Sequence, residues 1–371
     1  MSDAWMRYYY PPLFQEPWSH IDTTPRVSLS NGFDNWIKAD ESIDWHLDGL
    51  LQTIQAHEEA LLEQGIPAAE AKVSKDVDIV AWRGILSKIM AAPYDFFSDF
   101  ELNATCFQDT IYLELNHSYK DVVEVNSTQR QQRGMQQAAN RHGTSPELMQ
   151  YWGYKFEALS TLPRPWGECT REEIESRDTD IVNTNVQYCS IVRTGIGKTS
   201  LILAGEVDCV LDRKPDDRDK PIPWVELKTS ATQTDQSYKA LKKWEAKLLR
   251  IWAQSFLLGV PKVVVGFRSP VGQLESIQEL ETQRIPGSVR KGQRSWDGNV
   301  CINMTAAFLE FLKESLMGKD GVWRVKMARH SKQISILQVE PTGHGRIIEP
   351  DFKAHREKML AAEIAQKLGD S

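Results

Sequence analysis

Two strand-like segments carry charged residues whose types and spacing could perform metal-assisted chemistry. Glu206 and Asp208 are two apart in "GEVDCV", and Glu226 and Lys228 are two apart in "WVELKTS". Residues two apart in a strand share a face, so each pair is expected to point the same way. If the strands pair, one sheet face carries three carboxylates and an ammonium group, which is costly to bury without compensation. A hard divalent cation would compensate, because carboxylate oxygens are ligands that Mg²⁺ and Mn²⁺ prefer.

The separation of the two pairs along the chain also matches a nuclease pattern. Seventeen residues separate Asp208 from Glu226, and Lys228 follows two positions later, as in the half-motif of PD-(D/E)xK nucleases. In that pattern the acids hold metal, and the lysine faces the scissile phosphate or orients the attacking water. The alternative is an exposed sheet face with ordinary salt bridges, since strands often carry Glu and Lys by chance. The additional acid at Glu206 favours the nuclease hypothesis.

Three further residues are candidates for the same site. Glu157 closes the segment "GYKFE" and could supply another carboxylate for metal, although a glutamate near a helix end is often solvated. Arg83, in "AWRGILSKI", has a guanidinium suited to phosphate, and a salt bridge on a helix surface is the alternative. Gln254 lies on the apolar stripe of a predicted helix, where its amide needs a hydrogen-bond partner. A water, a phosphate or a structural partner would meet that need.

The composition is that of an ordinary globular protein without a global attraction to nucleic acid. The chain has 371 residues, 41% hydrophobic and 26% charged, with a formal net charge of −7. Any nucleic-acid site must therefore be a local basic cleft. No apolar run reaches the roughly 18–20 residues that span a bilayer, and the first residues do not resemble a secretory signal. The five cysteines form no CxxC pair, which favours a reducing compartment and argues against a zinc knuckle.

The pattern of elements predicts a mixed α/β fold: a single domain over residues 1–371, with mixed central β-sheets flanked by helices. Residues 1–35 are expected to be irregular, and 352–371 to form a helical or disordered tail. Ser145 and Pro146 are read as a helix start. Helices are predicted over 44–64, 79–91, 145–157, 235–258 and 304–317, a hairpin over 100–118, and strands within 188–212, 224–230, 262–269 and 333–340.

One segment imitates a phosphate-binding loop. "TGIGKTS", residues 194–200, ends like a Walker motif, but the first glycine of that motif would fall at Val192. The residues that follow are strand-like, so there is no helix N-terminus to bind an anion. We interpret the segment as the turn of a β-hairpin.

Several segments together resemble the DXO family of RNA 5′-end-processing enzymes, and most closely its fungal nuclear branch. They occur in order over most of the chain, from Tyr8 to at least Ser269. The resemblance implies a PD-(D/E)xK nuclease-like active site. The matching pieces are "YYYPPLF", "WRGILSKIMAAPYD", "YWGYKFEALSTLP", "QYCSIV", "GKTSLILAGEVDC", "WVELKTS", "WAQSFLLGV" and "GFRS".

The resemblance assigns metal ligands to matched positions. It implies that Glu157, Asp208 and Glu226 bind metal directly and that the backbone carbonyl of Leu227 adds a ligand. Glu206 would hold metal directly or through water. The implied cofactor is Mg²⁺ or Mn²⁺, as two ions.

The resemblance also assigns substrate contacts. Lys228 and Gln254 would contact the scissile phosphate or the nucleophilic water, and Arg83 would bind the 5′-end phosphates of RNA. Family members remove pyrophosphate from 5′-triphosphate RNA and excise incomplete caps. Many also remove NAD caps, and some degrade RNA from the 5′ end.

The fungal branch further implies a protein partner and a compartment. Its members bind and stabilise a nuclear 5′→3′ exoribonuclease, so a nuclear location is expected. Two alternatives to a 5′-end hydrolase stay open. One is a mainly non-catalytic stabilising subunit of that exoribonuclease, and the other is a DNA nuclease, suggested by the half-motif alone.

Overall fold

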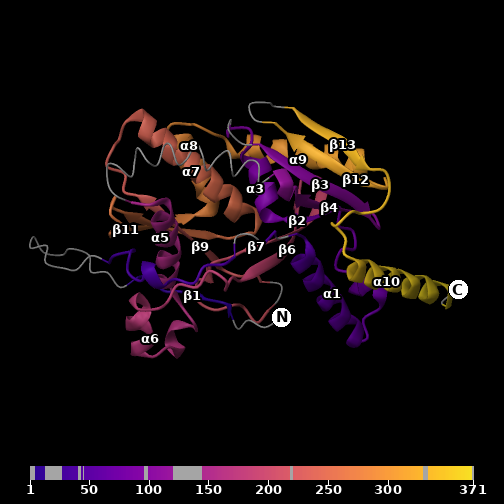
Figure 1. Cartoon of the computed structure of the whole chain (residues 1–371), viewed down its shortest axis with the longest axis horizontal. Helices are drawn as coiled ribbons and strands as arrows, with labels where there is room; N and C mark the ends of the chain where they lie inside the picture. The colour runs from indigo at the N-terminus through magenta and orange to yellow at the C-terminus, as the bar shows by residue number, and fades with distance from the viewer. Residues whose placement is uncertain are drawn as a thin grey trace, which may run out of the picture. The chain divides into compact units, whose positions relative to one another are not determined.

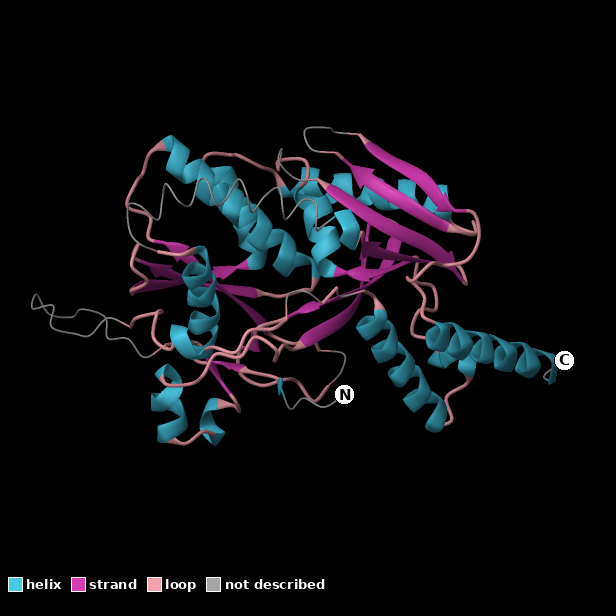
Figure 2. Ribbon diagram, in the orientation of Figure 1, coloured by secondary structure: helices cyan, strands magenta, loops and turns pink. Residues whose placement is uncertain are grey.

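The computed structural model describes residues 5–12, 27–40, 43–44, 46–95, 99–119, 144–217, 220–328 and 333–369. The chain forms two compact units. Unit 1 comprises residues 1–42, 123–190 and 206–297, and unit 2 comprises residues 43–122, 191–205 and 298–371. Both contain helices and strands, coloured separately in Figure 2. The predicted mixed α/β class with mixed sheets is confirmed, whereas the single-domain boundary stays a prediction.

The described part of unit 1 contains a mixed sheet of six strands in the order β11-β10-β9-β8-β1-β5. β9 runs parallel to β10, which pairs antiparallel with β11. The strands are β1 (Tyr8–Tyr9), β5 (Thr161–Leu162), β8 (Cys209–Val210), β9 (Trp224–Ala231), β10 (Lys262–Arg268) and β11 (Leu274–Glu281). The helices, labelled in Figure 1, are α5 (Pro146–Leu159), α6 (Arg171–Glu175), α7 (Tyr238–Leu257) and α8 (Ile285–Lys291).

The described part of unit 2 is built on a seven-stranded mixed sheet in the order β13-β12-β3-β4-β2-β7-β6, in which the start of β6 and the end of β7 are residues of unit 1. β2 lies parallel to both β4 and β7, and β3 pairs antiparallel with β4. The strands are β2 (Ile79–Trp82), β3 (Phe100–Phe107), β4 (Thr110–Leu115), β6 (Cys189–Ile196), β7 (Thr199–Glu206), β12 (Val322–Met327) and β13 (Ile334–Glu340). The helices are α1 (Asp48–Glu63), α2 (Ala68–Ala71), α3 (Arg83–Ala91), α9 (Gly298–Leu316) and α10 (Pro350–Gly369).

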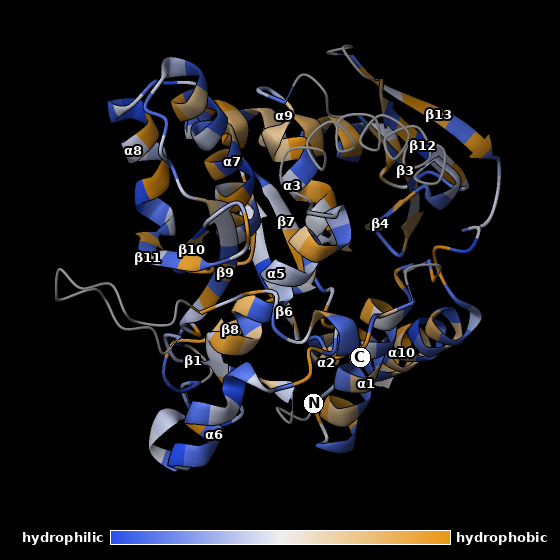
Figure 3. Ribbon diagram, turned by 60° about the vertical axis from the view of Figure 1, so that its left-hand side comes forward, coloured by the Kyte–Doolittle hydropathy of each residue, from blue (hydrophilic) through white to orange (hydrophobic). Residues whose placement is uncertain are grey.

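In unit 1, α5 and α7 cover opposite faces of β9 and β10. Trp152 and Phe156 of α5 belong to one buried cluster with Leu227 of β9. The ring of Trp244 in α7 lies 5.6 Å from the ring of Phe267 in β10. Phe267 is three positions after Val264, which pairs with Leu227 in the α5 cluster, so Phe267 points to the opposite face of the sheet. Alternating blue and orange along α7 in Figure 3 fits a helix with one apolar and one charged face. Side chains at even-numbered positions of β9 therefore face α7.

Several predicted elements form as expected. Ser145 caps α5 by accepting a hydrogen bond from the backbone N–H of Leu148. Gln108 and Asp109 connect β3 to β4 with positive φ angles of 47° and 61°, as the short hairpin requires. The Walker-like segment is a turn between β6 and β7, where Gly197 has φ 61°. The hairpin interpretation is therefore correct.

Three predictions of local structure need correction. Residues 79–91 are not one helix, because Ile79–Trp82 form the buried strand β2 before α3 begins at Arg83. Asp208 does not lie in a strand, since β7 ends at Glu206 and β8 begins at Cys209. The N-terminal segment includes the strand β1, although residues 1–4 and 13–26 of it lie outside the described residues. Short apolar runs fit helix and strand equally well, which explains the first error.

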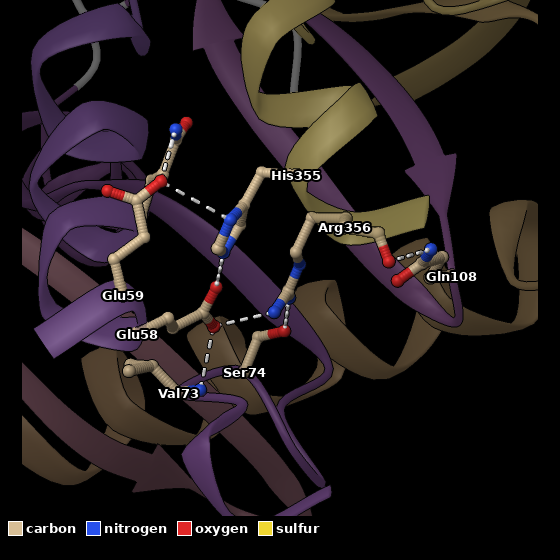
Figure 4. Close-up of polar contacts among 8 residues, drawn as sticks. Glu58, Glu59, Val73, Ser74, Gln108, His355 and Arg356 are labelled. Carbon is tan, nitrogen blue, oxygen red and sulfur yellow. Dashed lines mark hydrogen bonds and ion pairs between the residues drawn. The ribbon is translucent and has the colours of Figure 1, made fainter. Parts of the chain in front are cut away.

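The C-terminal tail forms α10, which packs against α1 and α2 of unit 2. Glu58 of α1 is fully buried and lies 2.6 Å from the Arg356 guanidinium and 3.0 Å from the His355 ring. The backbone N–H of Val73 and the hydroxyl of Ser74 extend this network (Figure 4). Residues 370–371 lie outside the described residues. Among the residues that the structure describes, no helix is both long and apolar enough to cross a membrane.

Candidate active site

The predicted carboxylates and lysine meet at β9 and the short segment that precedes β8. Lys228 Nζ lies 2.5 Å from Oε1 of Glu226, and the Glu226 side chain is only 3% exposed. Asp208 accepts a hydrogen bond of 2.6 Å at Oδ2 from the backbone N–H of Leu227. Loops between strands can turn a side chain toward a neighbouring strand, and here Asp208 is fixed against the middle of β9. The structure therefore brings the acid pair and the lysine together.

The alternation of β9 explains why Glu226 and Lys228 share a place while the strand stays buried. Val225 and Leu227 pack with α5 in one apolar cluster. The alternate residues, Glu226 and Lys228, therefore point to the α7 face. Trp224 and Val225 pair with β8 just beyond Asp208. Apolar residues on one face anchor the strand, and charged residues on the other build the site.

Glu157 joins the site from the last turn of α5. Burial raises its pKa well above the ordinary value of 4.5, and the Asp208 carboxylate raises it further, while Lys228 lowers it. Glu206 and Glu226 add to the increase. Such mutual effects require neighbouring charges, so these carboxylates form one electrostatic cluster.

Asp208 and Lys228 show the same coupling. Burial, and next the Glu226 carboxylate, raise the pKa of Asp208 from 3.8 to about 7, although Lys228 and the Leu227 N–H act in the opposite direction. Burial alone would lower the pKa of Lys228, but Glu226 and Asp208 raise it above its ordinary value of 10.5. The lysine therefore stays charged at neutral pH, whereas the carboxylates compete for one ammonium group.

This donor set fits a hard divalent cation. The cluster holds four carboxylates and one lysine, and the raised pKa values of Glu157 and Asp208 fit a negative charge that one lysine does not compensate. Oxygen donors of this kind suit Mg²⁺ and Mn²⁺. Among the described residues, no three His, Cys, Asp or Glu side chains are already arranged to hold an ion. Glu226 is instead paired with Lys228, and Asp208 with the Leu227 N–H.

The remaining predicted residues lie in different places. Gln254 is a half-buried residue of α7, the helix that covers the Glu226 and Lys228 face of β9. Arg83 is buried at the start of α3 in unit 2. Its contact with RNA phosphates, the phosphate contact of Gln254 and the metal ligation by Leu227 stay predictions.

A cavity of about 510 Å³ in unit 1 has three of the carboxylates in its wall, namely Glu157, Glu206 and Asp208. This volume falls within the range of small-molecule sites. Sequence reasoning missed its other polar residues, because most of them lie in irregular segments without periodicity, and Tyr154 of α5 carries no charge that would single it out. They include Arg7, Tyr154, Asn183, Gln187 and Tyr188. Lys247, also missed, is described below.

Comparison with known proteins identifies the family. Residues 1–353 match the model for RAI1-like PD-(D/E)XK nucleases. The protein "Decapping nuclease RAI1" of Emericella nidulans is 46% identical over 360 residues, covering 96% of this chain and 88% of that protein.

Two solved relatives cover nearly the whole chain. The crystal structure of Scheffersomyces stipitis Rai1 with (3′-NADP)⁺ and a calcium ion has a TM-score of 0.78 at 28% identity, covering 96% of this chain and 90% of that one. Candida albicans Rai1 in complex with pU5-Mn²⁺ has a TM-score of 0.79 at 26% identity, with coverage of 96% and 90%. Both relatives hold divalent ions, in agreement with the predicted cofactor class.

The family model spans most of the chain, and the predicted carboxylates and lysine lie together in unit 1. The prediction of a nuclease-class hydrolase is confirmed. The chain belongs to the family of RAI1-like PD-(D/E)XK nucleases.

Proposed function

We propose that this chain is a divalent-metal-dependent decapping nuclease acting on RNA 5′ ends. Its substrates are 5′-triphosphate RNA, from which it releases pyrophosphate, and RNA with unmethylated or NAD caps. Digestion of RNA in the 5′→3′ direction follows at the same site. The observation that carries the proposal is the crowding of Glu157, Glu206, Asp208 and Glu226 around Lys228. Such crowding suits metal-assisted attack on a phosphate.

Ligands of solved relatives support these substrates. The Candida albicans protein was crystallised with pU5 and Mn²⁺, which are an RNA with a 5′ phosphate and a divalent cation. The Scheffersomyces stipitis protein holds (3′-NADP)⁺ and calcium, which supports an NAD-ended RNA as substrate. An RNA substrate also favours this function over the DNA nuclease alternative.

The chain's own residues suggest how the phosphate is held. Lys228 carries a raised pKa beside Glu226 and can donate to a phosphate oxygen without losing its proton. The Gln254 amide, on the helix above this face, can donate to the same phosphate or to the attacking water. Arg83 serves the outer 5′ phosphates in this scheme.

The acids would hold the cofactor. Mg²⁺ or Mn²⁺ bound by Glu157, Glu206, Asp208, Glu226 and the Leu227 carbonyl would offset the phosphate charge and lower the pKa of a water. Without an ion, the raised pKa values of Asp208 and Glu157 favour the protonated forms of these carboxyl groups. Binding therefore requires these carboxyl groups to ionise.

We also propose that the chain works in the nucleus and stabilises a 5′→3′ exoribonuclease there. The support is the resemblance to the fungal branch together with the 46% identity to a fungal relative. Mixing the purified chain with the exoribonuclease of the same organism should give one peak on size-exclusion chromatography and a higher melting temperature for the nuclease. Two separate peaks with unchanged melting would contradict this part of the proposal.

End-labelled RNAs test the catalytic part. The purified chain with Mn²⁺ should release pyrophosphate from triphosphate RNA, the cap dinucleotide from unmethylated capped RNA, and the NAD moiety from NAD-capped RNA. A DNA of the same sequence and 5′ end serves as control and should react more slowly, since 2′-hydroxyl contacts select RNA. A folded protein that releases nothing from any RNA would favour the non-catalytic stabilising role.

A further inference from the structure

A second lysine approaches the site from α7. Lys247 is half-buried, and its Nζ donates a 2.6 Å hydrogen bond to the backbone oxygen of Thr229, the residue after Lys228. An ammonium group has three donors. Among the described residues, this carbonyl is the only hydrogen-bond acceptor of Lys247, so two donors stay available for a ligand.

Lys247 has no carboxylate partner in the part of the chain that the structure describes, unlike the half-buried Lys262 and Lys313. Lys262 lies 2.6 Å from Glu279, and Lys313 lies 2.7 Å from Asp78. Arg268 at the end of β10 is also without a carboxylate there. Its guanidinium lies 4.2 Å over the Trp152 ring, and its buried Nε has no hydrogen-bond partner.

The charges near Lys247 are positive. Burial lowers the pKa of Lys247 to about 8, and Arg268, Lys228 and Lys243 each lower it further. Lys228 is paired with Glu226, but no carboxylate pairs with Lys247 among the described residues, and an uncompensated cation is unfavourable in the free protein and favourable around an anion. In an acidic chain, Lys247 and Lys243 thus supply local positive charge of the kind that suits an RNA phosphate.

The position of Lys247 on α7 lines it up with the predicted phosphate contacts. It lies seven residues before Gln254 and four after Lys243, so all three share one side of the helix. At 1.5 Å per residue, Lys247 is about 10 Å along the axis from Gln254 and about 6 Å from Lys243. The three side chains therefore form a row along α7 that runs from Gln254 to Lys247 and on to Lys243.

We propose that Lys247, followed by Lys243, binds the RNA backbone phosphate downstream of the scissile phosphate and so positions the RNA body. The ligand is a phosphodiester anion of single-stranded RNA, recognised by charge and not by base. The inference rests on the proposed function and deepens it. It assigns Lys247 as a positioning residue for the RNA, distinct from the residues that face the reacting phosphate.

Salt-dependent binding tests this role. The probe is a 5′-phosphorylated, fluorescently labelled U10 RNA in Ca²⁺, measured by anisotropy between low and physiological salt. Lys247→Met keeps the aliphatic stem and removes the charge. It should raise Kd about tenfold and lower the slope of log Kd against log salt by about 0.7, the value for one phosphate contact on a single strand.

The controls separate a phosphate contact from a structural role. Lys242→Met removes an exposed charge from α7 that lies 5.8 Å over the Tyr238 ring, and it should keep the wild-type slope. Lys247→Arg should restore the slope, because it restores the charge. Should Lys247→Met fail to fold, Lys243→Met replaces it, since Lys243 is exposed, and it should lower the slope in the same direction.

Two outcomes would overturn the inference. One is a wild-type slope in folded Lys247→Met, and the other is an equal loss in Lys242→Met. Failure of the proposed function looks different, because the wild-type chain itself would then release no pyrophosphate and bind no RNA. Wild-type catalysis with an unchanged Lys247→Met slope would contradict the downstream phosphate contact alone.

Discussion

The carboxylates around Lys228 link metal binding to pH. Glu157 and Asp208 both have raised pKa values because burial and neighbouring carboxylates penalise their ionised forms. Glu226 lies 2.5 Å from the Lys228 ammonium group. A divalent ion would remove the conflict, so protons and metal compete for the same oxygens.

Asp208 gives this competition a measurable window. Its pKa in the folded, metal-free chain is about 7 against an ordinary value of 3.8, so between these values the folded state binds more protons than the unfolded state. The stability contributed by its protonation is therefore complete below about pH 4 and lost as pH rises to about 7. Metal binding should show the opposite trend.

We predict that the increase in melting temperature caused by Mn²⁺ grows between pH 5.5 and 8 in the wild-type chain. In Asp208→Asn, where this site does not titrate, both that increase and its pH dependence should be much smaller. Differential scanning fluorimetry with and without EDTA measures both. An equal, pH-independent Mn²⁺ shift in the two proteins would exclude Asp208 as a ligand.

The elements of unit 1 hold the acids at fixed positions. The close contact of α5 with β10 allows this to be tested. An added Cβ at Gly266 of β10 would lie 2.5 Å from Phe156, the residue before Glu157. Gly153, on the same helix, has no atom within 4 Å of an added Cβ. Gly266 thus permits the approach of α5, whereas the space beside Gly153 leaves room for a methyl group.

We predict that Gly266→Ala lowers the free energy of unfolding by about 1–3 kcal/mol, because the extra methyl group forces α5 away from the sheet. Hydrolysis should fall as well, since Glu157 moves with α5. Gly153→Ala is the matched control and should be neutral or stabilising by up to about 1 kcal/mol. Urea melts and pyrophosphate release measure both effects. Full activity in Gly266→Ala would show that the position of α5 does not set that of Glu157.

Local signals in the sequence predicted many of the helices and strands. Ser145 with Pro146 marked the start of α5, and the Gln108–Asp109 turn marked a hairpin. Ile79–Trp82 was misread as helix, since a short apolar run has no distinguishing period and depends on its neighbours β4 and β7. Tertiary contacts decide such cases.

The candidate site could also be predicted in part from the local spacing of residues. The spacing of Glu206, Asp208, Glu226 and Lys228 placed them together correctly, although Asp208 reaches the site from between two strands. Lys247 was not predictable, because a lysine on a long helix usually faces solvent. Its burial depends on the distant carbonyl of Thr229, which no local pattern encodes.

At the scale of the whole molecule, the C-terminal helix is part of unit 2 and not a loose tail. α10 supplies His355 and Arg356 to the buried carboxylate of Glu58, nearly 300 positions earlier in the chain (Figure 4). Sequence reasoning could not place this contact, since an isolated glutamate in an amphipathic helix normally reads as exposed.

We predict that Glu58→Gln lowers the free energy of unfolding by about 3–5 kcal/mol, because it leaves the buried Arg356 without a compensating charge. Lys367→Met breaks an exposed pair of α10 with Glu363 and should cost less than about 0.5 kcal/mol. Chemical denaturation of the full chain measures both. Equal stability of the two variants would mean that α10 does not depend on this network.

The most direct test of the central claim is pyrophosphate release from 5′-triphosphate RNA across a Mn²⁺ titration, with wild type and Asp208→Asn side by side. We predict no release in EDTA, release that rises with Mn²⁺ in the wild type, and a loss of about a hundredfold or more in a folded Asp208→Asn. Metal-independent release, or equal activity of the two proteins, would contradict the assignment of these carboxylates as the metal site of an RNA 5′-end hydrolase.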